Sequence, residues 1–276
     1  MYVGVDIGGT KTLLAVFDQH GVVTEESEFP TPKNYSHWLL ELQHQLAHLE
    51  TKDFQAGAVG MPAVTIDRQH GRGLAFGNLP WKNVPIQADV ERVCDCPIVV
   101  ENDCKMACLS EALLLKDKYH KVLYITISTG IGYGLVDNGV IDTNIGDGGG
   151  REIMLEHKGK IMPWEDFASG RAIVERFGRK AKDITDETTW QTIARDLAKG
   201  LIELIAVTEP EVIVFGGAVG AYFGRYGKQL EDELKKYHLP QVPIPPLRAA
   251  ERPEEAVIYG CYEFAKQNYS RAAVSQ

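Results

Sequence analysis

Two short stretches of this chain share the same order: a strand-like run, a glycine-containing turn and a second strand-like run. They are VDIGGTKT at residues 5–12 and ISTGIGYG at residues 127–134. In the first stretch Asp6 stands between two apolar residues, and Gly8 and Gly9 follow directly. Aspartate is a poor strand former and glycine weakens regular structure, so this order is locally unfavourable. We therefore interpret the stretch as a site that needs a carboxylate and a closely approachable backbone.

The remaining sequence predicts strands and helices in the same order in each half. Hydrophobic periodicity and turn residues predict the first-half strands at 2–7, 13–18, 22–29, 56–64 and 97–103, with helices from Ser36, at 88–93 and at 106–115. The second half restarts with strands at 122–128, 132–141 and 211–217, and with helices near 190–207, after 217 and near 254–268. An Asn138-Gly139 pair is typical of a tight hairpin turn. This order predicts a duplicated α/β fold with two lobes and a cleft between them.

Composition argues against several classes of function. The 276 residues carry a net charge of −9 and contain no basic stripe, which argues against nucleic-acid binding. No apolar run approaches the length of a membrane span, and the N-terminus lacks a basic signal region, so we expect a soluble, cytoplasmic protein. The odd number of cysteines suits a reducing compartment, and the isolated Cys94-x-Cys96 pair is not expected to bind zinc.

The opening stretch has two interpretations once the P-loop is set aside. A P-loop requires a lysine after its second glycine and a helix next, but Thr10 and a strand follow Gly9. The first interpretation is a phosphate site, in which glycine amides and the Thr10 hydroxyl face an anion and Asp6 holds a hydrated Mg²⁺. The second is a plain hairpin with an incidental aspartate. The second turn at 127–134 and a glycine pair in FGGAVG (215–220) favour the phosphate site.

These motifs together resemble the ROK family of sugar kinases, within the actin/hexokinase/Hsp70 superfamily. VDIGGTKT is similar to the family's first phosphate motif, STGIGYG to its second and VIVFGGAV to its adenosine motif. The segments NLPWKNVPI (78–86), ENDCKMACLSEA (101–112) and AVIYGCYEFA (256–265) resemble its sugar-lobe segment, its catalytic stretch and its closing helix. The resemblance covers nearly the whole chain.

The resemblance implies a two-lobed actin/hexokinase-like (ribonuclease H-like) fold with an interlobe cleft. It predicts a sugar-side lobe of residues 1–108 plus 263–276 and a nucleotide-side lobe of residues 109–262. A regulator branch of the family has an N-terminal DNA-binding domain. Because this chain starts directly at the phosphate motif, we do not expect it to belong to that branch.

The resemblance also implies a role for each matching residue. Asp103 is similar to the general base that takes the proton of the sugar hydroxyl, although a helix N-cap is the alternative. Sugar binding is implied for Asn78, Asn102, Asp103, Glu152 and Glu165, with a solvated surface carboxylate as the alternative for the two glutamates. Phosphate and nucleotide binding is implied for Asp6, Gly8, Gly9, Thr10, Lys11, Ser128, Thr129, Gly130, Gly132, Gly216 and Gly217, with Asp6 holding Mg²⁺ through water.

Three departures from the family pattern lie on the sugar side. Leu155 stands where the family has a sugar- and zinc-binding histidine, and His157 is interpreted as a surface residue. The cysteine-rich zinc loop is missing, so no zinc site is expected, and Met162, Pro163 and Trp164 are expected to hold this segment by packing. Ala63 replaces a glycine of the family's G-x-P-G segment and can reshape the sugar side.

The sequence as a whole predicts a cytoplasmic, Mg²⁺-dependent kinase that transfers the γ-phosphate of ATP to a hydroxyl of a hexose or hexose derivative. One alternative is a kinase of the same fold with polyphosphate as donor. The other is a nucleotide- or sugar-binding regulatory protein that has lost turnover. The sugar and its hydroxyl stay open, and the resemblance allows a homodimer. No membrane or nucleic-acid partner is expected.

Overall fold

The computed structural model describes residues 1–237 and 242–274, which fall into two compact units. Unit 1 comprises Met1–Ser110 and the C-terminal segment that begins at Glu255, and unit 2 comprises Glu111–Glu254. The C-terminal boundary therefore precedes the boundary at residue 263 expected from the sequence. The reason is that helix α9 (Ala256–Val274) already contacts the unit 1 sheet in its first turn, where Val257 lies against Gly60 and Ile258 against Gly4.

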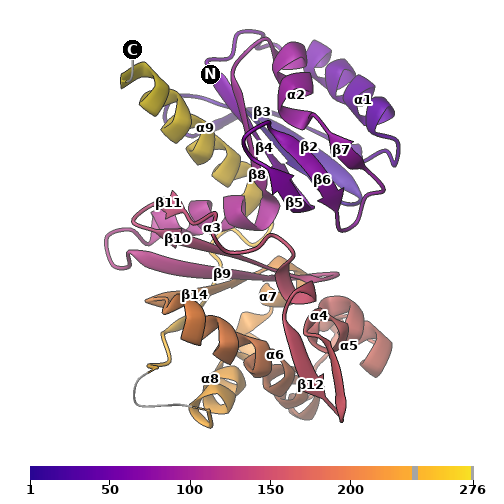
Figure 1. Cartoon of the computed structure of the whole chain (residues 1–276), viewed down its shortest axis with the longest axis vertical. Helices are drawn as coiled ribbons and strands as arrows, with labels where there is room; N and C mark the ends of the chain where they lie inside the picture. Colours follow the sequence, from indigo (N-terminus) through magenta and orange to yellow (C-terminus); the bar gives the residue numbers. More distant parts are fainter. Residues whose placement is uncertain (238–241, 275–276) are drawn as a thin grey trace. The chain divides into compact units, whose positions relative to one another are not determined.

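Unit 1 is built on a five-stranded sheet (Figure 1). Its strands, in spatial order, are β3 (Val23–Pro30), β2 (Lys11–Phe17), β1 (Tyr2–Ile7), β4 (Ala56–Met61) and β8 (Ile98–Asn102). The pairs β3–β2 and β2–β1 are antiparallel, whereas β1–β4 and β4–β8 are parallel. The parallel strands β1 and β8 therefore end at the same edge of the sheet.

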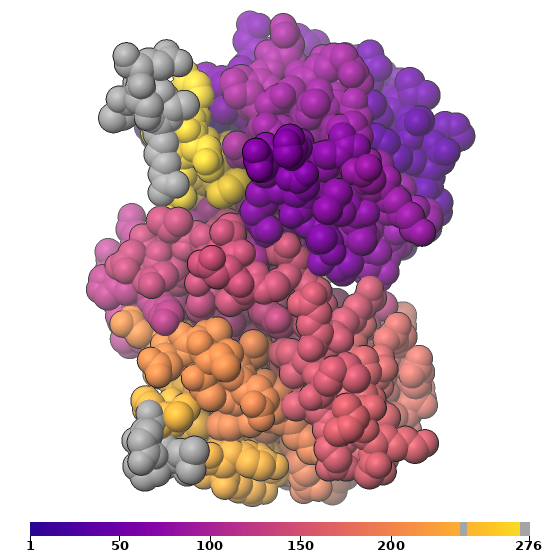
Figure 2. Space-filling model, in the orientation of Figure 1, coloured from indigo at the N-terminus to yellow at the C-terminus, as the bar shows by residue number. Residues whose placement is uncertain are grey.

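Helices cover both faces of this sheet. Alternate residues of β1, Val3, Val5 and Ile7, are fully buried in one core cluster with residues of α1 (Tyr35–His48) and α2 (Ile86–Cys94). Gly4 faces the other way, towards α9. Figure 2 shows the yellow atoms of α9 directly against the purple atoms of unit 1. Helix α3 (Asp103–Leu114) begins where β8 ends.

A separate three-stranded sheet in unit 1 was not predicted. It consists of β5 (Ala63–Asp67), β6 (Arg72–Phe76) and β7 (Lys82–Val84), and β5 begins only after Pro62 interrupts the strand predicted at 56–64. Its β5–β6 ladder contains register shifts, and most of its side chains are at least partly exposed. Neither regular alternation nor a buried apolar run marks such strands in a sequence.

Unit 2 repeats the sheet of unit 1. Its strands, in spatial order, are β11 (Val140–Ile141), β10 (Ile131–Asp137), β9 (Lys121–Ile127), β14 (Val212–Gly216) and β15 (Leu247–Ala249). The first two pairs are again antiparallel and the last two parallel. Asn138 and Gly139 both have positive φ, as the predicted hairpin turn requires. The predicted duplicated α/β fold is confirmed.

Helices of unit 2 pack on one face of its sheet around a large apolar core. The α-helices are α4 (Glu165–Ala168), α5 (Gly170–Phe177), α6 (Glu187–Thr208), α7 (Gly217–Gly220) and α8 (Gly227–Lys235), and short 3₁₀ turns lie at Gly149–Arg151, Ala181–Asp183 and Phe223–Arg225. Residues of α4, α5, α6 and α8 share one buried cluster with β9, β10 and β14. Within the described ranges, no helix is both long and apolar enough to cross a membrane.

A short hairpin occupies the segment in which the sequence lacks the zinc loop. Its strands are β12 (Met154–His157) and β13 (Lys160–Pro163), which pair in an antiparallel two-stranded sheet. The chain then enters the core at Trp164, which is fully buried, lies against Gly200 of α6 and donates its indole N–H to the Asp196 carbonyl oxygen at 3.1 Å. The expected anchoring by packing is therefore found, because Trp164 is buried in the unit 2 core and Met162 packs against the same core.

Candidate active site

Two carboxylates of unit 1 lie at the same edge of its sheet. Asp6 of β1 is paired with Gly60 of β4, and Gly60 is paired with Glu101 of β8, two residues before Asp103. Burial and the nearby charge of Asp103 together raise the pKa of Asp6 to about 7, against the charge of Lys11, which lowers it. Burial also raises the pKa of Asp103 to about 6, against hydrogen bonds from Cys104 that lower it. The structure thus brings together the two acids singled out in the sequence.

The raised pKa of Asp6 predicts an unusual pH dependence of stability. In the ligand-free protein the folded state holds a proton that the unfolded chain releases above its ordinary value of 3.8, so stability falls as pH rises from about 4 to about 7. We expect Asp6→Asn to raise the free energy of unfolding at pH 8 by about 2 kcal/mol, half the full linkage value because the carboxylate is partly exposed.

Urea unfolding of both proteins at pH 4 and pH 8 measures this effect. The difference between Asp6→Asn and wild type should disappear at pH 4. Asp18→Asn is the matched control, because backbone N–H donors lower the pKa of Asp18 and its replacement should destabilise the protein at pH 8. A stabilisation by Asp6→Asn that is equal at both pH values would contradict the account.

The first glycine turn is held by backbone hydrogen bonds. The Gly8 amide donates to the Lys11 carbonyl oxygen at 2.9 Å, and a Cβ at Gly8 would lie only 2.7 Å from that oxygen. The Thr31 hydroxyl donates to the Gly8 carbonyl oxygen at 2.8 Å, and the Thr31 amide donates to the Thr10 carbonyl oxygen at 2.9 Å. Only glycine fits at position 8 without moving the backbone of this turn.

Two other predicted residues lie at this turn with partners of their own. The Cβ of Asn78 would be 2.9 Å from a Cβ at Gly9, so Asn78 packs directly against the first turn. The Lys11 ammonium forms an exposed ion pair with Glu28 at 2.7 Å. Asn78 was predicted as a sugar-side residue, and it lies against the predicted phosphate turn.

Asn102 is the N-cap of helix α3, a role that was the alternative to a general base for Asp103. Its side-chain oxygen accepts hydrogen bonds from the amides of Cys104 at 2.9 Å and Lys105 at 3.2 Å, at the start of α3. Its side-chain nitrogen donates to the Ala63 carbonyl oxygen at 3.0 Å. Asp103 also accepts the Cys104 amide at 2.8 Å from the first turn of the helix. Asn102 therefore fixes the direction in which α3 leaves the strand.

Glu101 belongs to the site although sequence reasoning did not select it. Its side chain is 2% exposed, and Arg68 binds both of its oxygens, Nη2 at 2.6 Å and Nε at 2.8 Å. The same carboxylate accepts the Asn102 amide at 2.7 Å. Such a bidentate pair fixes geometry strongly. The ENDC sequence marks Glu101, but the choice of Arg68 as its partner depends on the fold of β5.

The second glycine turn, in unit 2, is organised by Ser128. The Ser128 amide donates to the Gly130 carbonyl oxygen at 2.9 Å, and the Ser128 carbonyl oxygen accepts the Gly170 amide at 2.7 Å. The Ser128 hydroxyl accepts the Ala218 amide at 3.1 Å. Ser128 therefore joins the turn to the first residues of α5 and α7, while Thr129 is exposed at the tip.

The glycine pair after β14 lies against the same turn. Gly216 pairs with Thr126 of β9, and a Cβ at Gly216 would collide with the Tyr124 hydroxyl. Gly217 has a φ of +77°, and a Cβ there would lie 2.5 Å from the Thr126 hydroxyl and 2.6 Å from the Ser128 hydroxyl. Gly132, on the far side of the turn, pairs with Thr126 in the β9–β10 ladder. The structure brings the predicted second phosphate motif and adenosine motif together within unit 2.

The two predicted sugar-side glutamates differ in their surroundings. Glu152 is exposed, and its carboxylate folds back over Gly146 and Gly148 of the glycine-rich loop. Burial, together with the charges of Glu152 and Asp147, raises the pKa of Tyr133 to about 12. Glu165 is only 4% exposed, so the alternative of a solvated surface carboxylate is wrong for this residue.

The prediction that His157 is a surface residue is wrong. His157 is 8% exposed and stacks on the Phe167 ring, with ring centroids 4.2 Å apart. Its Nδ1 lies 3.6 Å from the Asp196 carboxylate and has no hydrogen-bond partner, and burial lowers its pKa. Leu155 is partly buried against the unit 2 core. His157 was misread because inward and outward positions of a short hairpin cannot be told apart without its partner strand.

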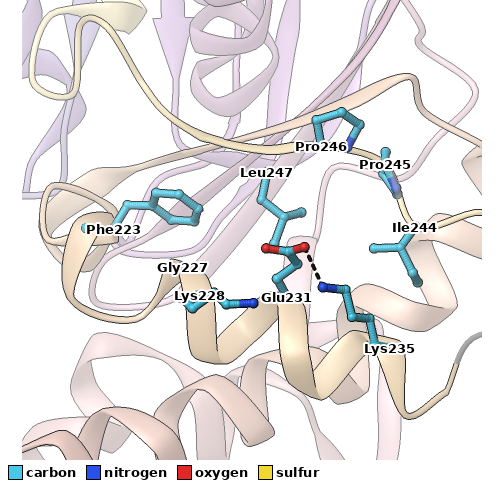
Figure 3. A pocket seen from close by; sticks show the side chains of 10 residues that line it. Phe223, Gly227, Lys228, Glu231, Lys235, Ile244, Pro245, Pro246 and Leu247 are labelled. Atoms are coloured by element: carbon cyan, nitrogen blue, oxygen red, sulfur yellow. Dashed lines mark ion pairs between the residues drawn. The ribbon is translucent and has the colours of Figure 1, made fainter.

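An open groove of about 610 Å³ lies between α8 and the segment that leads into β15, and Figure 3 shows side chains that line it. Its lining includes Phe223, Ile244 and Leu247, together with the ion pair of Glu231 and Lys235 at 2.7 Å. None of its ten lining residues is a site residue predicted from the sequence. We therefore do not assign this groove to the candidate active site.

Comparisons with known proteins identify the family to which the chain belongs. The model of the ROK family matches residues 2–268. The chain is 29% identical to an N-acetylmannosamine kinase of Escherichia coli, covering 85% of this chain and 90% of that protein. It is 24% identical to a glucokinase of Streptomyces coelicolor, covering 79% and 81%. The structure is similar to that of a ROK family glucokinase from Streptomyces griseus in complex with glucose and AMPPNP, with a TM-score of 0.80, 22% identity and coverage of 96% and 99%.

The repeated sheets with their glycine turns define an actin/hexokinase-like fold, as predicted. Among proteins with this fold, the family model identifies one family for this chain, because it matches nearly all of its residues. The chain belongs to the ROK family.

Proposed function

We propose that this protein is a carbohydrate kinase that transfers the γ-phosphate of ATP to a hydroxyl of a hexose or hexose derivative. The observation that carries the proposal is the position of Asp103. It stands at the start of α3, beside Asp6 and at the sheet edge that carries the first glycine turn. The activities of the sugar kinases to which the chain is similar support the same reaction.

Asp103 has the properties of a general base for this reaction. A sugar hydroxyl is a weak nucleophile, and a carboxylate within hydrogen-bond reach takes its proton as the phosphoryl group transfers. A pKa raised to about 6 by burial leaves Asp103 ionised at neutral pH but more basic than an ordinary aspartate. The two hydrogen bonds of Asn102 to the start of α3 fix the backbone that carries this base.

The donor set at Asp6 fits a hydrated Mg²⁺. Two neighbouring, partly buried carboxylates with raised pKa values gain from a dication, which relieves their mutual repulsion. Among the residues that the structure describes, no three acidic, histidine or cysteine side chains form a metal cluster. Mg²⁺ commonly keeps several waters and binds through one or two carboxylates plus substrate phosphates. When bound, the ion would neutralise charge on the phosphates, with Asp6 as its contact.

The remaining predicted residues divide between the two substrates. Backbone amides around Gly8, Gly9 and Thr10 and around Ser128–Gly132 would hold phosphates, because both turns leave backbone without side chains in front of it. Gly216 and Gly217 would lie against the nucleoside. Asn102, Glu152 and Glu165 would position the sugar. The family resemblance and the contacts within each unit support this division.

A pH–rate profile tests the state of the base. Because a protonated Asp103 cannot accept the hydroxyl proton, kcat/KM, which reports the free enzyme, should fall about tenfold per unit below pH about 6 and level off above it. The profile should be recorded with Mg²⁺–ATP and sugar both well below their KM values, and with the stability of the protein checked at each pH. An acid limb with its midpoint near the ordinary aspartate value of 3.8 would contradict the raised pKa.

Sugar-dependent ADP release tests the function itself. We expect at least one member of a panel of hexoses, N-acetylated hexosamines and ketoses to stimulate ADP release from ATP, and polyphosphate in place of ATP tests the alternative donor. Nucleotide binding without stimulation by any sugar would overturn the kinase proposal in favour of a regulatory protein. Product formation from polyphosphate alone would replace ATP as the donor.

A further inference from the structure

The segment between β3 and α1 is fastened to the first glycine turn of unit 1. The Thr31 amide and hydroxyl donate to the carbonyl oxygens of Thr10 and Gly8. Two residues further on, the Lys33 ammonium donates to the Gly9 carbonyl oxygen at 2.9 Å. Three successive carbonyl oxygens of the turn therefore bind this one segment, and Lys33 places a positive charge at the turn.

The backbone of Lys33 is fixed although its side chain is exposed. Its carbonyl oxygen accepts the indole N–H of Trp81, a residue that is 3% exposed, at 3.0 Å. The next residue, Asn34, caps α1 by accepting the His37 amide at 3.0 Å. Because the backbone is held on both sides, the ammonium stays within the reach of one lysine side chain from the turn.

The charge of Lys33 is not neutralised by an acid of the protein. Within residues 1–237 and 242–274, the Lys33 ammonium forms no ion pair, and the Gly9 carbonyl oxygen is its one hydrogen-bond partner. Lys11, by contrast, pairs with Glu28, and its charge also lowers the pKa of Asp6. A lysine ammonium has three N–H donors, of which the Gly9 carbonyl uses one. Two donors and a positive charge therefore remain for an anion at this turn.

We infer that Lys33 binds the terminal phosphate of the nucleotide, the phosphoryl group that the proposed reaction transfers. The inference deepens the proposed function and rests on it, since it takes the first turn to bind phosphates of the donor. The turn directly follows β1, which carries Asp6, and Asp103 is close enough for its charge to act on Asp6. A phosphate at this turn is therefore the one beside the proposed base. A lysine there would offset the charge that builds up on the transferring group.

Calorimetry with Mg²⁺–AMPPNP and with Mg²⁺–ADP, without sugar, tests the inference, because only AMPPNP carries a third phosphate. We expect Lys33→Gln to weaken AMPPNP binding about tenfold, the loss of one charge-assisted hydrogen bond, and to change ADP binding less than about twofold. Lys33→Arg keeps the charge and should recover most of the affinity. Loss of support for the turn would weaken both nucleotides alike, so the ratio of the two affinities isolates the contact with the terminal phosphate.

Lys52→Gln is the matched control in the same unit. The Lys52 ammonium is also on an exposed residue and donates to backbone carbonyl oxygens, those of Leu46 at 3.0 Å and Ala47 at 2.9 Å. These carbonyls lie in the last turn of α1, about 20 Å along the helix from its start beside Lys33. Lys52→Gln should bind both nucleotides like the wild-type protein. Because both lysines are exposed, both variants should be folded, which urea unfolding checks.

Two results for Lys33→Gln would overturn the inference. Equal weakening of AMPPNP and ADP binding would mean that Lys33 only supports the turn, and unchanged binding of both would mean that it contacts no phosphate. A wild-type protein that binds neither nucleotide would overturn the proposed function together with the inference. A protein that shows the expected loss of AMPPNP binding but phosphorylates no sugar in the panel fails the proposed function alone.

Discussion

Replacing Asp103 with asparagine is expected to lower kcat by about 10²- to 10⁴-fold, the usual contribution of a general base. The amide keeps an oxygen that can accept the Cys104 amide, which Asp103 accepts at 2.8 Å, so the start of α3 should be preserved. Affinity for the sugar should change little, because the substitution leaves the other proposed sugar ligands, Asn102, Glu152 and Glu165, in place. Steady-state kinetics combined with calorimetric sugar binding separates these two effects.

Asp53→Asn is a suitable control for this variant, because Asp53 is an exposed aspartate in the same unit. It should have wild-type kcat and stability. Wild-type turnover in Asp103→Asn would remove Asp103 from the mechanism. A loss of sugar binding equal to the loss of kcat would instead make Asp103 a ligand whose role as base is not needed.

The second large effect is expected on stability. Trp164→Ala should lower the free energy of unfolding by about 3–5 kcal/mol, the usual range for removing a buried aromatic side chain. Trp164 is fully buried against Gly200, so the substitution leaves a cavity, and it also deprives the Asp196 carbonyl oxygen of its indole donor. The β12–β13 hairpin would lose its anchor, because the chain enters the core at this residue.

Urea unfolding followed by circular dichroism measures the effect of Trp164→Ala. Val207→Ala is the matched control in unit 2, because Val207 is 77% exposed, and it should change stability by less than about 0.5 kcal/mol. Trp164→Phe keeps most of the buried volume and should fall between the two. A loss below about 1 kcal/mol in Trp164→Ala would mean that packing at Trp164 does not hold this segment.

The regular elements of the fold were predictable because their signals are local. The β1 and β9 strands, the Asn138-Gly139 turn and the repeated order of elements follow from periodicity and turn residues. The β5–β6–β7 sheet was missed because its strands are short, irregular and partly exposed. Whether such a segment forms a strand depends on the strands with which it pairs in the folded protein, and no local sequence pattern contains that information.

The candidate site was predictable to a similar extent. Asp6 and Asp103 stand in recognisable motifs, and their electrostatic coupling follows from the parallel register of β1, β4 and β8. Two arginines of the site were not selected: Arg68, which binds Glu101, and Arg151, which binds Glu165. Nothing in the sequence next to either arginine reveals which carboxylate it will bind. His157 was misjudged for the same reason, since its burial depends on Phe167 and on α6.

Transfer of a radioactive γ-phosphate from ATP is the most direct test of the central claim, that this chain is a sugar kinase with Asp103 as its base. With the sugar that best stimulates ADP release, we predict that the wild-type protein moves the label onto the sugar. Asp103→Asn should move almost none, although it still binds both substrates. Label that appears only as inorganic phosphate with every sugar, or that reaches the sugar equally fast with Asp103→Asn, would contradict the account.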